Sequence, residues 1–580
     1  MKKKTSNRVT VGPLKDEQER PVTDSKEQAN ILNRWYCSVF TREDTSHIPE
    51  AVDVYDGNNM LEEVVITREK VKKKLQSLKP KSAPGPDKIS PAVLQSMADI
   101  LCVPLTSIFS KCQEEGVVPG DWKLANVTPI FKKGSKSAPG NYRPVSLTCI
   151  ICKVMESLIK DAIVEHLANN SLIRSSQHGF TAGRSCLTNL LEYMEELTSL
   201  IEMGHSVDMF YLDFSKAFDL VPHRRLLVKL RGLGIQGKVA SWVEEWLSDR
   251  KQRVVLNGEV SDWGDIFSGV VQGSVLGPTK FLCFINDLDL AVDMTMAAGG
   301  EQRCSIIKKF ADDTKWGTVV ESAEDRAYFQ AGLDSLQAWA DTWQMQYNVD
   351  KCHILHVGKD NVKHQYHLGG RIVEASKFEK DVGVLINDDL KPSLQCAKAA
   401  GKANQVLGQI SRGVSYRDKD TLLRLYKTYV RPHLEYCQAA WSPWGIGDRQ
   451  VLEQVQQRAV RMMTNLKSKS YEGRLKELGL TSLVERRKRG DMITMFRIMT
   501  GKDKVDPSLW FSVPRSEAAS TRQNTGWLNV KKPARSNLEV RRNQFSQRVV
   551  DDWNWLPDWV KKSVTVNSFK NNLDKHLYQR

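Results

Sequence analysis

Apolar positions recur at helical spacing in several parts of the chain. Residues 29–39 place Ala, Leu, Trp, Tyr and Val on one face, which predicts an amphipathic helix. A basic helix is expected over residues 61–80, ending at the proline- and glycine-containing stretch 79–87, which cannot continue a helix. Residues 1–25 are polar, charged and without such spacing, and therefore predict a disordered leader.

Short runs of β-branched and aromatic residues predict strands between these helices. The clearest are residues 126–131, the run that ends at Asp213, and residues 351–357. Two further runs, around Ile306 and around Val319, predict the arms of a hairpin. Helical spacing returns between the strands, at residues 187–194, 281–288 and 333–343. The middle of the chain is therefore expected to combine strands with helices.

From residue 391 to residue 500 the pattern is helical and basic. Two apolar stripes are expected to face a core. The first consists of Leu422, Leu425, Tyr426, Tyr429 and Val430, and the second of Val451, Leu452, Val455, Ala459, Met462 and Met463.

The charge of the chain narrows the class of partner. Lys and Arg number 84 and Asp and Glu 69, a net charge of +15 that favours a polyanion such as nucleic acid. A merely soluble basic protein would have the same balance. No apolar run reaches membrane-spanning length. The eleven scattered cysteines fit a reducing compartment, and Cys149 and Cys152 are interpreted as buried core residues.

Two adjacent acids, Asp312 and Asp313, stand at the expected hairpin tip. They repel each other and do not favour packing, so they need a positive partner. A pair of Mg²⁺ ions, which lie about 3.5–4 Å apart in two-metal sites, would require a carboxylate from another strand. Asp213, at the end of an apolar strand, is the best candidate. By itself the Asp-Asp pair is more typical of a surface turn than of a metal site.

Three sequence motifs, in this order along the chain, resemble those of the reverse transcriptases of non-LTR (LINE-type) retrotransposons. The resemblance is nearest to the jockey and chicken-repeat group. The three motifs are Tyr211-Leu212-Asp213-Phe214-Ser215-Lys216-Ala217-Phe218-Asp219, Gly269-Val270-Val271-Gln272-Gly273-Ser274-Val275-Leu276-Gly277-Pro278 and Phe310-Ala311-Asp312-Asp313-Thr314. The family usually has Pro at the position of Val271 and an apolar residue at that of Lys280. The segments Gln177-His178-Gly179-Phe180 and Gly183-Arg184-Ser185 resemble a further part of these enzymes.

The resemblance implies an RNA-directed DNA polymerase. The fold would be α+β, a right-hand polymerase with fingers, palm and thumb and a basic helical C-terminal region. Asp213, Asp312 and Asp313 would be both catalytic residues and ligands of two Mg²⁺ ions, with Mn²⁺ as a substitute. The implied partners are an RNA template, a DNA primer or target, and deoxynucleoside triphosphates, with no membrane. The oligomeric state is left open.

Further site residues follow from the same resemblance. In the family, basic residues of the fingers meet the triphosphate, and an aromatic side chain excludes the 2′-hydroxyl. The expected nucleotide-binding residues are Lys132, Lys133, Arg143, Phe218, Gln272 and Gly273. The expected nucleic-acid-binding residues are Lys351, Arg458, Arg461, Arg486, Arg487, Lys488 and Arg489. A core phenylalanine remains the alternative for Phe218, and a nuclear signal or a solvated face the alternatives for residues 486–489.

The resemblance covers residue 25 to the end and suggests boundaries. We expect a leader and helix over 1–60, fingers over 61–205, a palm over 206–390, a thumb over 391–510 and a C-terminal segment over 511–580. The endonuclease domain that usually precedes the polymerase is expected to be missing, and the natural terminus to be present. The expected location is intracellular, in nucleus and cytoplasm as a ribonucleoprotein. The rival interpretation is a catalytically inactive or domesticated copy that binds nucleic acid.

Overall fold

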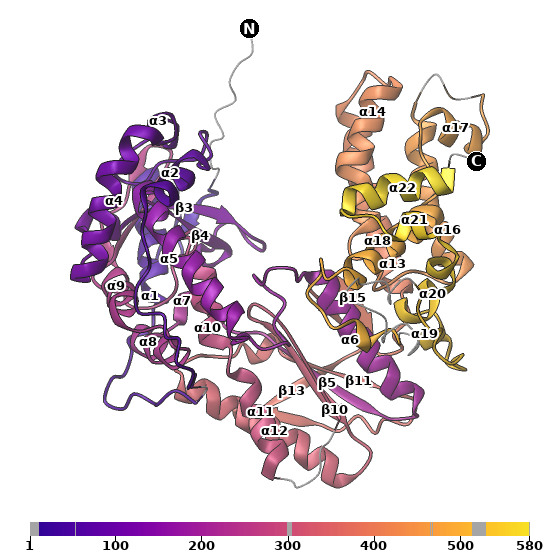
Figure 1. Ribbon diagram of the computed structural model, residues 1–580, viewed down its shortest axis with the longest axis horizontal. Helices are drawn as coiled ribbons and strands as arrows, with labels where there is room; N and C mark the ends of the chain where they lie inside the picture. The colour runs from indigo at the N-terminus through magenta and orange to yellow at the C-terminus, as the bar shows by residue number, and fades with distance from the viewer. Residues whose placement is uncertain are drawn as a thin grey trace. The chain divides into compact units, whose positions relative to one another are not determined.

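The computed structural model describes residues 11–52, 54–298, 304–463, 466, 468–512 and 529–578. The chain divides into two compact units. The first unit comprises Met1–Ser175, Phe214–Met294 and Asp334–Asn348, and the second comprises Ser176–Asp213, Thr295–Leu333 and Val349–Arg580. Figure 1 shows the elements of each unit.

A five-stranded sheet forms the centre of the first unit. Its order is β4 (Tyr142–Thr148), β3 (Leu124–Phe131), β6 (Lys251–Leu256) and β7 (Glu259–Val260), and β8 (Gly264–Asp265) also pairs with β6. β3 pairs with β4 in antiparallel and with β6 in parallel orientation. The predicted strand at 126–131 is confirmed and extends two residues further toward the N-terminus.

The first helix packs on this sheet. α1 (Ser25–Ser38) begins at Asp24, whose side chain accepts a hydrogen bond from the Glu27 N–H, and buries Ala29, Leu32 and Tyr36. These side chains form one core with Val127 and Val254 of the sheet. The predicted amphipathic helix is thereby confirmed.

Two predictions for the N-terminal part were wrong. Residues 1–10 lie outside the described part, but β1 (Leu14–Lys15) and β2 (Pro21–Val22) pair with each other, and Leu14 is fully buried. The expected basic helix over 61–80 is only α2 (Arg68–Gln76), because Thr67 caps its N-terminus by accepting a hydrogen bond from the Lys70 N–H. Leu61 instead forms a β-bridge with Ile235.

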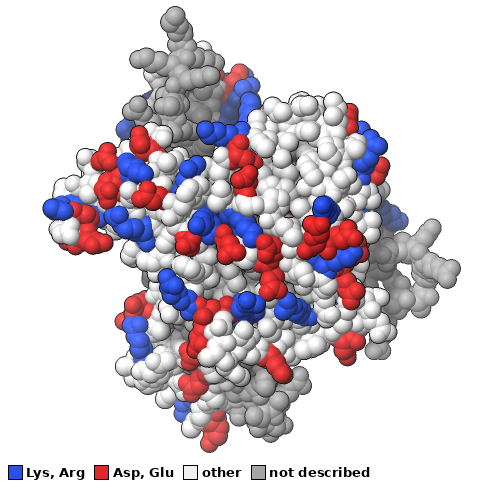
Figure 2. Space-filling view, turned by 90° about the vertical axis from the view of Figure 1, so that its left-hand side faces the viewer, with Lys and Arg blue, Asp and Glu red and all other residues white. Residues whose placement is uncertain are grey.

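Helices complete the first unit. Cys149 and Cys152, at the start of α5, are buried as predicted, and each of the eleven cysteines is a free thiol. Figure 2 shows basic and acidic side chains interspersed on one face of the molecule, so the excess of positive charge is not concentrated on that face.

The remaining helices of the first unit are α3 (Pro91–Ser96), α4 (Ala98–Glu115), α5 (Ile150–Asn169), α7 (Ala217–Leu220), α8 (His223–Gly232), α9 (Gly237–Leu247), α10 (Gly277–Ile285) and α11 (Leu288–Ala298).

A six-stranded sheet forms the base of the second unit. β5 (Val207–Leu212) is fully buried and lies between β10 (Asp313–Val319) and β11 (His353–Val357), with antiparallel pairing on both sides. The order is β12 (Tyr366–Leu368), β13 (Arg371–Ser376), β11, β5, β10 and β9 (Ser305–Phe310). The predicted strands before Asp213 and around the acidic turn are confirmed.

One helix packs against each face of this sheet. α6 (Cys186–Glu202) lies on the face of Tyr211, whose hydroxyl forms a 2.8 Å hydrogen bond with the hydroxyl of Tyr193. On the other face, the Trp316 ring stacks on Phe329 of α12 (Ala323–Thr342) at 4.7 Å. Because side chains alternate along a strand, Asp213 and Asp313 belong to the face that α6 covers.

The rest of the second unit is helical, apart from the hairpin β14 (Phe378–Asp381) and β15 (Val384–Asn387). The two predicted apolar stripes, over residues 422–430 and 451–463, are largely buried. Tyr429 of the first stripe and Val451 of the second are exposed. Phe545, Trp553 and Phe569 belong to the same core as the preceding helices, so the described part of 511–580 has no separate core. The helices are α13 (Ser393–Gly413), α14 (Lys419–Leu425), η4 (Tyr426–Val430), α15 (Arg431–Glu435), α16 (Ile446–Arg461), α17 (Tyr471–Glu477), α18 (Leu483–Met499), α19 (Glu539–Arg542), α20 (Phe545–Trp555), α21 (Asp558–Lys561) and α22 (Val566–Tyr578). In the described ranges, no helix has the length and apolar content needed to cross a bilayer.

Candidate active site

The acidic pair lies where a two-residue turn between β9 and β10 leads into β10. Asp313 pairs with Phe310 across the hairpin, which leaves Ala311 and Asp312 as the turn residues. Ala311 has a φ of +59°, the left-handed conformation that residues with a Cβ rarely adopt. The turn is therefore constrained by its surroundings and not by its own preference.

Asp213 faces this turn from the neighbouring strand. Thr314 pairs with Leu212 at the end of the β10–β5 ladder, and Asp313 and Asp213 are the next residues beyond this pair. The structure thus places the three carboxylates that the sequence motifs single out at one end of adjacent strands, although Asp213 and Asp312 are 99 positions apart in the chain.

Electrostatics at the turn show an excess of negative charge. Loss of water around the carboxyl group and the charges of Asp312, Asp381 and Asp213 raise the pKa of Asp313 to about 6, although the side chain itself is exposed. Asp381 forms a close ion pair with Lys315 of β10, which also donates a 2.6 Å hydrogen bond to Asn189 of α6. One lysine therefore balances one acid, and the remaining carboxylates still repel one another.

Lys351 supplies a second positive charge. Its Nζ lies 3.3 Å from Oδ1 of Asp213, and both side chains are partly exposed. Lys351 is predicted from the sequence to bind nucleic acid, whereas in the structure its ammonium group forms an ion pair with Asp213, a candidate metal ligand. Binding of nucleic acid by this residue stays a prediction.

These residues fit a divalent cation of the Mg²⁺ type. They offer carboxylate oxygens, which Mg²⁺ prefers, in a place where negative charge is in excess. Among the residues that the structure describes, no three His, Cys, Asp or Glu side chains are already gathered as a metal shell.

The predicted nucleotide-binding residues lie in the first unit. Lys132, Lys133 and Arg143 are exposed at the loop end of the β3–β4 hairpin, where the Lys132 N–H donates a 2.8 Å hydrogen bond to Asn141 O. On the same strand, the Ser146 N–H donates to Gln272 O at 2.8 Å. A Cβ on the following residue, Gly273, would lie 2.5 Å from Ser146 O, so only glycine fits there. β4 therefore links the basic hairpin to the Gln272-Gly273 loop.

Gln272 is held from a second side. Its Nε2 donates a 3.0 Å hydrogen bond to Oδ1 of Asp219, the last residue of the Asp213 motif. Burial raises the pKa of Asp219 to about 6. The sequence motif gives Asp219 no role, and its position within the short helix α7 carries no sign of this contact.

The other side of the same loop is anchored by Glu156, which was not predicted from the sequence. Its Oε2 accepts hydrogen bonds from the Val275 and Leu276 N–H groups, at 2.8 and 3.2 Å. An acid in the middle of α5 carries no signal of such a role. Lys280, one of the departures from the family pattern, is fully buried with Nζ 3.6 Å from the centre of the Trp246 ring.

Phe218 stacks on Phe281 of α10, with the ring centres 4.3 Å apart. Its side chain is only half-buried, so the ring is neither a fully enclosed core residue nor a fully exposed one. The predicted selection against ribonucleotides stays a prediction.

The predicted basic contacts of the helical region fall into two groups. Arg458 and Arg461 are exposed on α16. By contrast, Arg486 forms an ion pair with Glu435, Arg489 forms two hydrogen bonds of 2.6 and 2.8 Å with Asp574, and Arg487 is buried. Lys488 is exposed and lies 3.5 Å from Asp552. The 486–489 run therefore stabilises the helical region, and its part in binding nucleic acid stays a prediction.

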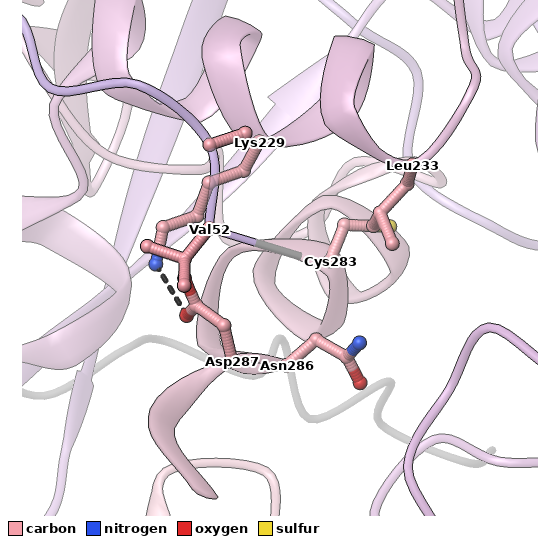
Figure 3. Close-up of a pocket in the computed structure, with 7 residues that line it drawn as sticks. Val52, Lys229, Leu233, Cys283, Asn286 and Asp287 are labelled. Atoms are coloured by element: carbon pink, nitrogen blue, oxygen red, sulfur yellow. Dashed lines mark hydrogen bonds and ion pairs between the residues drawn. The ribbon is translucent and has the colours of Figure 1, made fainter. Parts of the chain in front are cut away.

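A small cavity in the first unit is not a nucleotide site. Lys229 and Asp287 meet at its wall in a 2.6 Å ion pair, beside Cys283 and Asn286 (Figure 3). Its volume of about 10 Å³ holds no more than a water molecule.

Comparison with known proteins bears on the whole site. Residues 130–384 match the family model of the reverse transcriptase (RNA-dependent DNA polymerase) domain. This range includes Asp213, Asp312 and Asp313, as well as the β3–β4 hairpin from residue 130 onward. Residues 130–384 are thus similar to a reverse transcriptase domain.

The curated proteins to which this chain is similar include polymerases of mobile elements. The chain is 27% identical to the RNA-directed DNA polymerase from mobile element jockey of Drosophila melanogaster, over 64% of this chain and 41% of the relative. It is 26% identical to the jockey polymerase of Drosophila funebris, over 71% and 45% respectively. For the probable RNA-directed DNA polymerase from transposon BS of Drosophila melanogaster the identity is 24%, over 68% and 44%. The resemblance to the jockey branch is confirmed, and the chain spans less than half the length of these relatives.

Proposed function

We propose that this chain is an RNA-directed DNA polymerase of a non-LTR retrotransposon. The observation that carries the proposal is the meeting of Asp213 with the Asp312-Asp313 turn on adjacent strands, within a matched reverse transcriptase domain. An adjacent pair of acids opposite a third has little value for packing, but it suits transfer of a nucleotide to a primer.

The proposal includes the right-hand arrangement of this enzyme class. Residues 61–205 would act as fingers, 206–390 as palm and 391–510 as thumb, with a leader before and a C-terminal segment after them. The basic hairpin of β3 and β4 suits the fingers, because an Arg fork and a Lys point charge both bind phosphate. The sheet that carries the acids suits the palm.

Asp213, Asp312 and Asp313 would hold the metal, Mg²⁺ or Mn²⁺ in its place. When bound, the metal would lower the pKa of the primer 3′-hydroxyl and neutralise charge on the triphosphate. The chain's own part would be positioning. Lys351 would leave Asp213 as the cation enters, Lys132, Lys133 and Arg143 would bind the triphosphate, and Gln272 and Gly273 would contact the base pair. Phe218 would lie beside the sugar.

The partners would be an RNA template, a DNA primer or target, and deoxynucleoside triphosphates. The exposed Arg458 and Arg461 would contact phosphates of the bound duplex, which carry no base identity. Bound to its RNA template, the chain would act as a ribonucleoprotein in the nucleus and the cytoplasm.

Primer extension tests the proposal. The purified chain is mixed with a DNA primer annealed to an RNA template, deoxynucleoside triphosphates and Mg²⁺, and the products are sized on a gel. Extension that stops when a chelator removes Mg²⁺ is the expected result. Binding of primer–template without any extension, with Mg²⁺ or Mn²⁺, would instead favour an inactive nucleic-acid-binding protein.

A further inference from the structure

A short segment of the second unit runs beside the catalytic hairpin. The His178 N–H donates a 2.9 Å hydrogen bond to Lys309 O, and the Lys309 N–H donates a 2.8 Å hydrogen bond to Ser176 O. Gln177 thereby forms a parallel bridge with Lys309. The segment acts as a one-residue extension of the sheet beyond β9, next to the turn that carries the acids.

Gln177 reaches from this segment to the turn itself. Its Oε1 accepts a 2.9 Å hydrogen bond from the Ala311 N–H and a 2.8 Å hydrogen bond from the Gly179 N–H. Its Nε2 donates to Ala311 O at 3.4 Å. The side-chain amide therefore binds both polar groups of one residue, the residue with a φ of +59°. Gln177 is 1% exposed, so water does not compete for these groups.

Gly179 also lies close to the turn. A Cβ at this position would lie 2.3 Å from the Ala311 N atom and 2.9 Å from the Phe310 carbonyl carbon. Backbone cannot give way as a flexible side chain can, so any larger residue would displace the turn.

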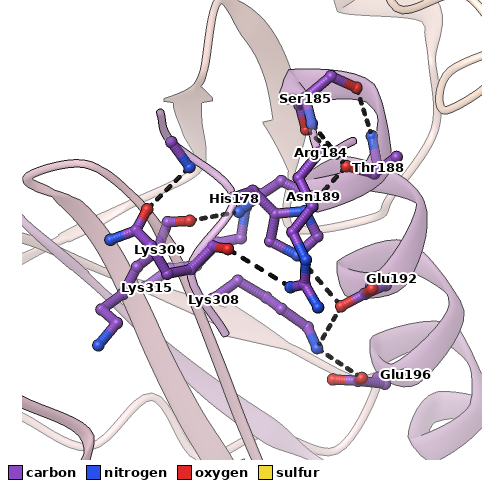
Figure 4. Close-up of polar contacts among 12 residues, drawn as sticks. His178, Arg184, Ser185, Thr188, Asn189, Glu192, Glu196, Lys308, Lys309 and Lys315 are labelled. Carbon is purple, nitrogen blue, oxygen red and sulfur yellow. Dashed lines mark hydrogen bonds and ion pairs between the residues drawn. The ribbon is translucent and has the colours of Figure 1, made fainter. Parts of the chain in front are cut away.

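A buried polar network fixes the segment in turn. His178 lies with Nδ1 2.8 Å from Thr188 Oγ1 and Nε2 3.2 Å from Glu192 Oε2, both on α6 (Figure 4). Lys308 of β9 joins the same network, with Nζ 3.0 Å from Glu192 and 2.7 Å from Glu196. On the same helix, Asn189 Nδ2 donates a 3.0 Å hydrogen bond to Lys309 O. α6 thus holds both the segment and the hairpin.

We propose that Gln177 is a positioning residue of the polymerase, which holds the Ala311 peptide in the left-handed conformation that presents Asp312 and Asp313. It touches no reacting atom, and it acts through the backbone between the two strands of the hairpin. The inference rests on the proposed function for its kinetic consequences, whereas the clamp itself is independent of activity.

Two variants test the clamp. Gln177→Met keeps the length of the side chain and removes all three hydrogen bonds. Gly179→Ala leaves every donor and acceptor in place and adds a methyl group that would displace Ala311. Gln456→Met is the matched control, because Gln456 is an equally buried glutamine of the same unit whose hydrogen bonds go to Tyr426, Tyr471, Glu453 and Thr481.

Three measurements are made on each variant. Hydrogen–deuterium exchange of a peptide that spans residues 306–316 reports the hairpin without any substrate. Mn²⁺ titration followed by electron paramagnetic resonance reports the metal site in the absence of nucleic acid. Primer extension gives kcat, KM for the deoxynucleotide and the Mg²⁺ concentration for half-maximal rate, and primer–template binding is measured separately.

The clamp predicts faster exchange in the hairpin and weaker Mn²⁺ binding for Gln177→Met and Gly179→Ala. It also predicts a kcat lowered by about 10- to 100-fold, as expected for a small misplacement of catalytic groups, with primer–template binding unchanged. Gln456→Met should change none of these beyond its effect on the folded fraction.

The inference would be overturned if Gln177→Met had the exchange rate of the wild-type hairpin and the Mn²⁺ affinity of the wild type. It would also be overturned if the decreases in kcat and in Mn²⁺ binding were fully explained by a smaller fraction of folded protein. If the unmodified chain does not extend a primer, the proposed function fails, and the exchange and Mn²⁺ measurements still decide the clamp. If one variant does not fold, the other is measured alone, and its wild-type behaviour overturns the inference equally.

Discussion

The ammonium group of Lys351 lies 3.3 Å from a carboxylate oxygen of Asp213. A lysine in this place competes with any cation for the same oxygen, and Asp213 is the acid that comes from outside the hairpin. The pair is partly exposed, so its strength is of the order of 0.2–1 kcal/mol.

Replacing Lys351 with Gln should therefore strengthen Mn²⁺ binding to the chain in the absence of nucleic acid. The expected gain is at most about fivefold, the equivalent of an exposed ion pair. Mn²⁺ titration followed by electron paramagnetic resonance measures it. Weaker Mn²⁺ binding in this variant would show that Lys351 supports the metal site and does not compete with it.

Replacing Asp312 with Asn should abolish primer extension without weakening primer–template binding, because the change removes a metal ligand and no phosphate contact. Extension rates and binding are measured on the same preparation. Asp350→Asn serves as the control, since Asp350 is an exposed acid of the same unit that pairs with Arg371. Extension by Asp312→Asn at the wild-type rate would remove this residue from the metal site.

Replacing Phe218 with Val should raise the incorporation of ribonucleotides relative to deoxynucleotides, because it opens space on the side of the ring away from Phe281. The ratio of kcat/KM for the two substrates is the measurement. Phe267→Val, at an exposed phenylalanine of the same unit, is the control. An unchanged ratio together with a lower melting temperature would make Phe218 a packing residue only.

The two groups of arginines should separate in their response to salt. Replacing Arg458 and Arg461 with Gln should flatten the slope of log affinity against log salt, by about 0.9 for each phosphate that is no longer neutralised on duplex DNA, or about 0.7 on single strands. Replacing Arg486 and Arg489 with Gln should chiefly lower the melting temperature, because it leaves Glu435 and Asp574 without these basic partners. If the Arg486 and Arg489 variant flattened the salt dependence and the Arg458 and Arg461 variant lowered the melting temperature, the nucleic-acid contacts would lie on α18.

Stability should depend on pH through Asp219. Its pKa in the folded chain, about 6, lies above the ordinary value of 3.8, so the folded state favours the protonated form. Its contribution to stability is present at low pH and is lost as pH rises toward and through 6. The loss is at most about 3 kcal/mol.

Asp219→Asn should remove this part of the pH dependence while the amide still accepts the hydrogen bond from Gln272. Denaturant unfolding between pH 4.5 and 7.5, on the variant and on the wild type, measures the difference. Parallel curves would mean that Asp219 has the same pKa in the folded and unfolded chains.

Much of the local structure could be predicted from the sequence because it depends on near neighbours. Apolar residues at helical spacing located α1 and α6, and β-branched runs located β3, β5 and β11. The acids before a turn located the candidate site. Where a local cap overrode the pattern, as Thr67 does for α2, the prediction of the boundary was wrong.

The sequence by itself determined the chemistry of the candidate residues, which are three carboxylates in the second unit and basic residues and a glycine in the first. Only the tertiary structure decided which partners these residues have. Three hydrogen bonds join residues that lie 53 to 138 positions apart in the chain: Lys351 with Asp213, Gln272 with Asp219, and Ala311 with Gln177. Such contacts depend on strand register and helix packing, which leave no periodic trace in the chain, and therefore no spacing rule could have revealed them.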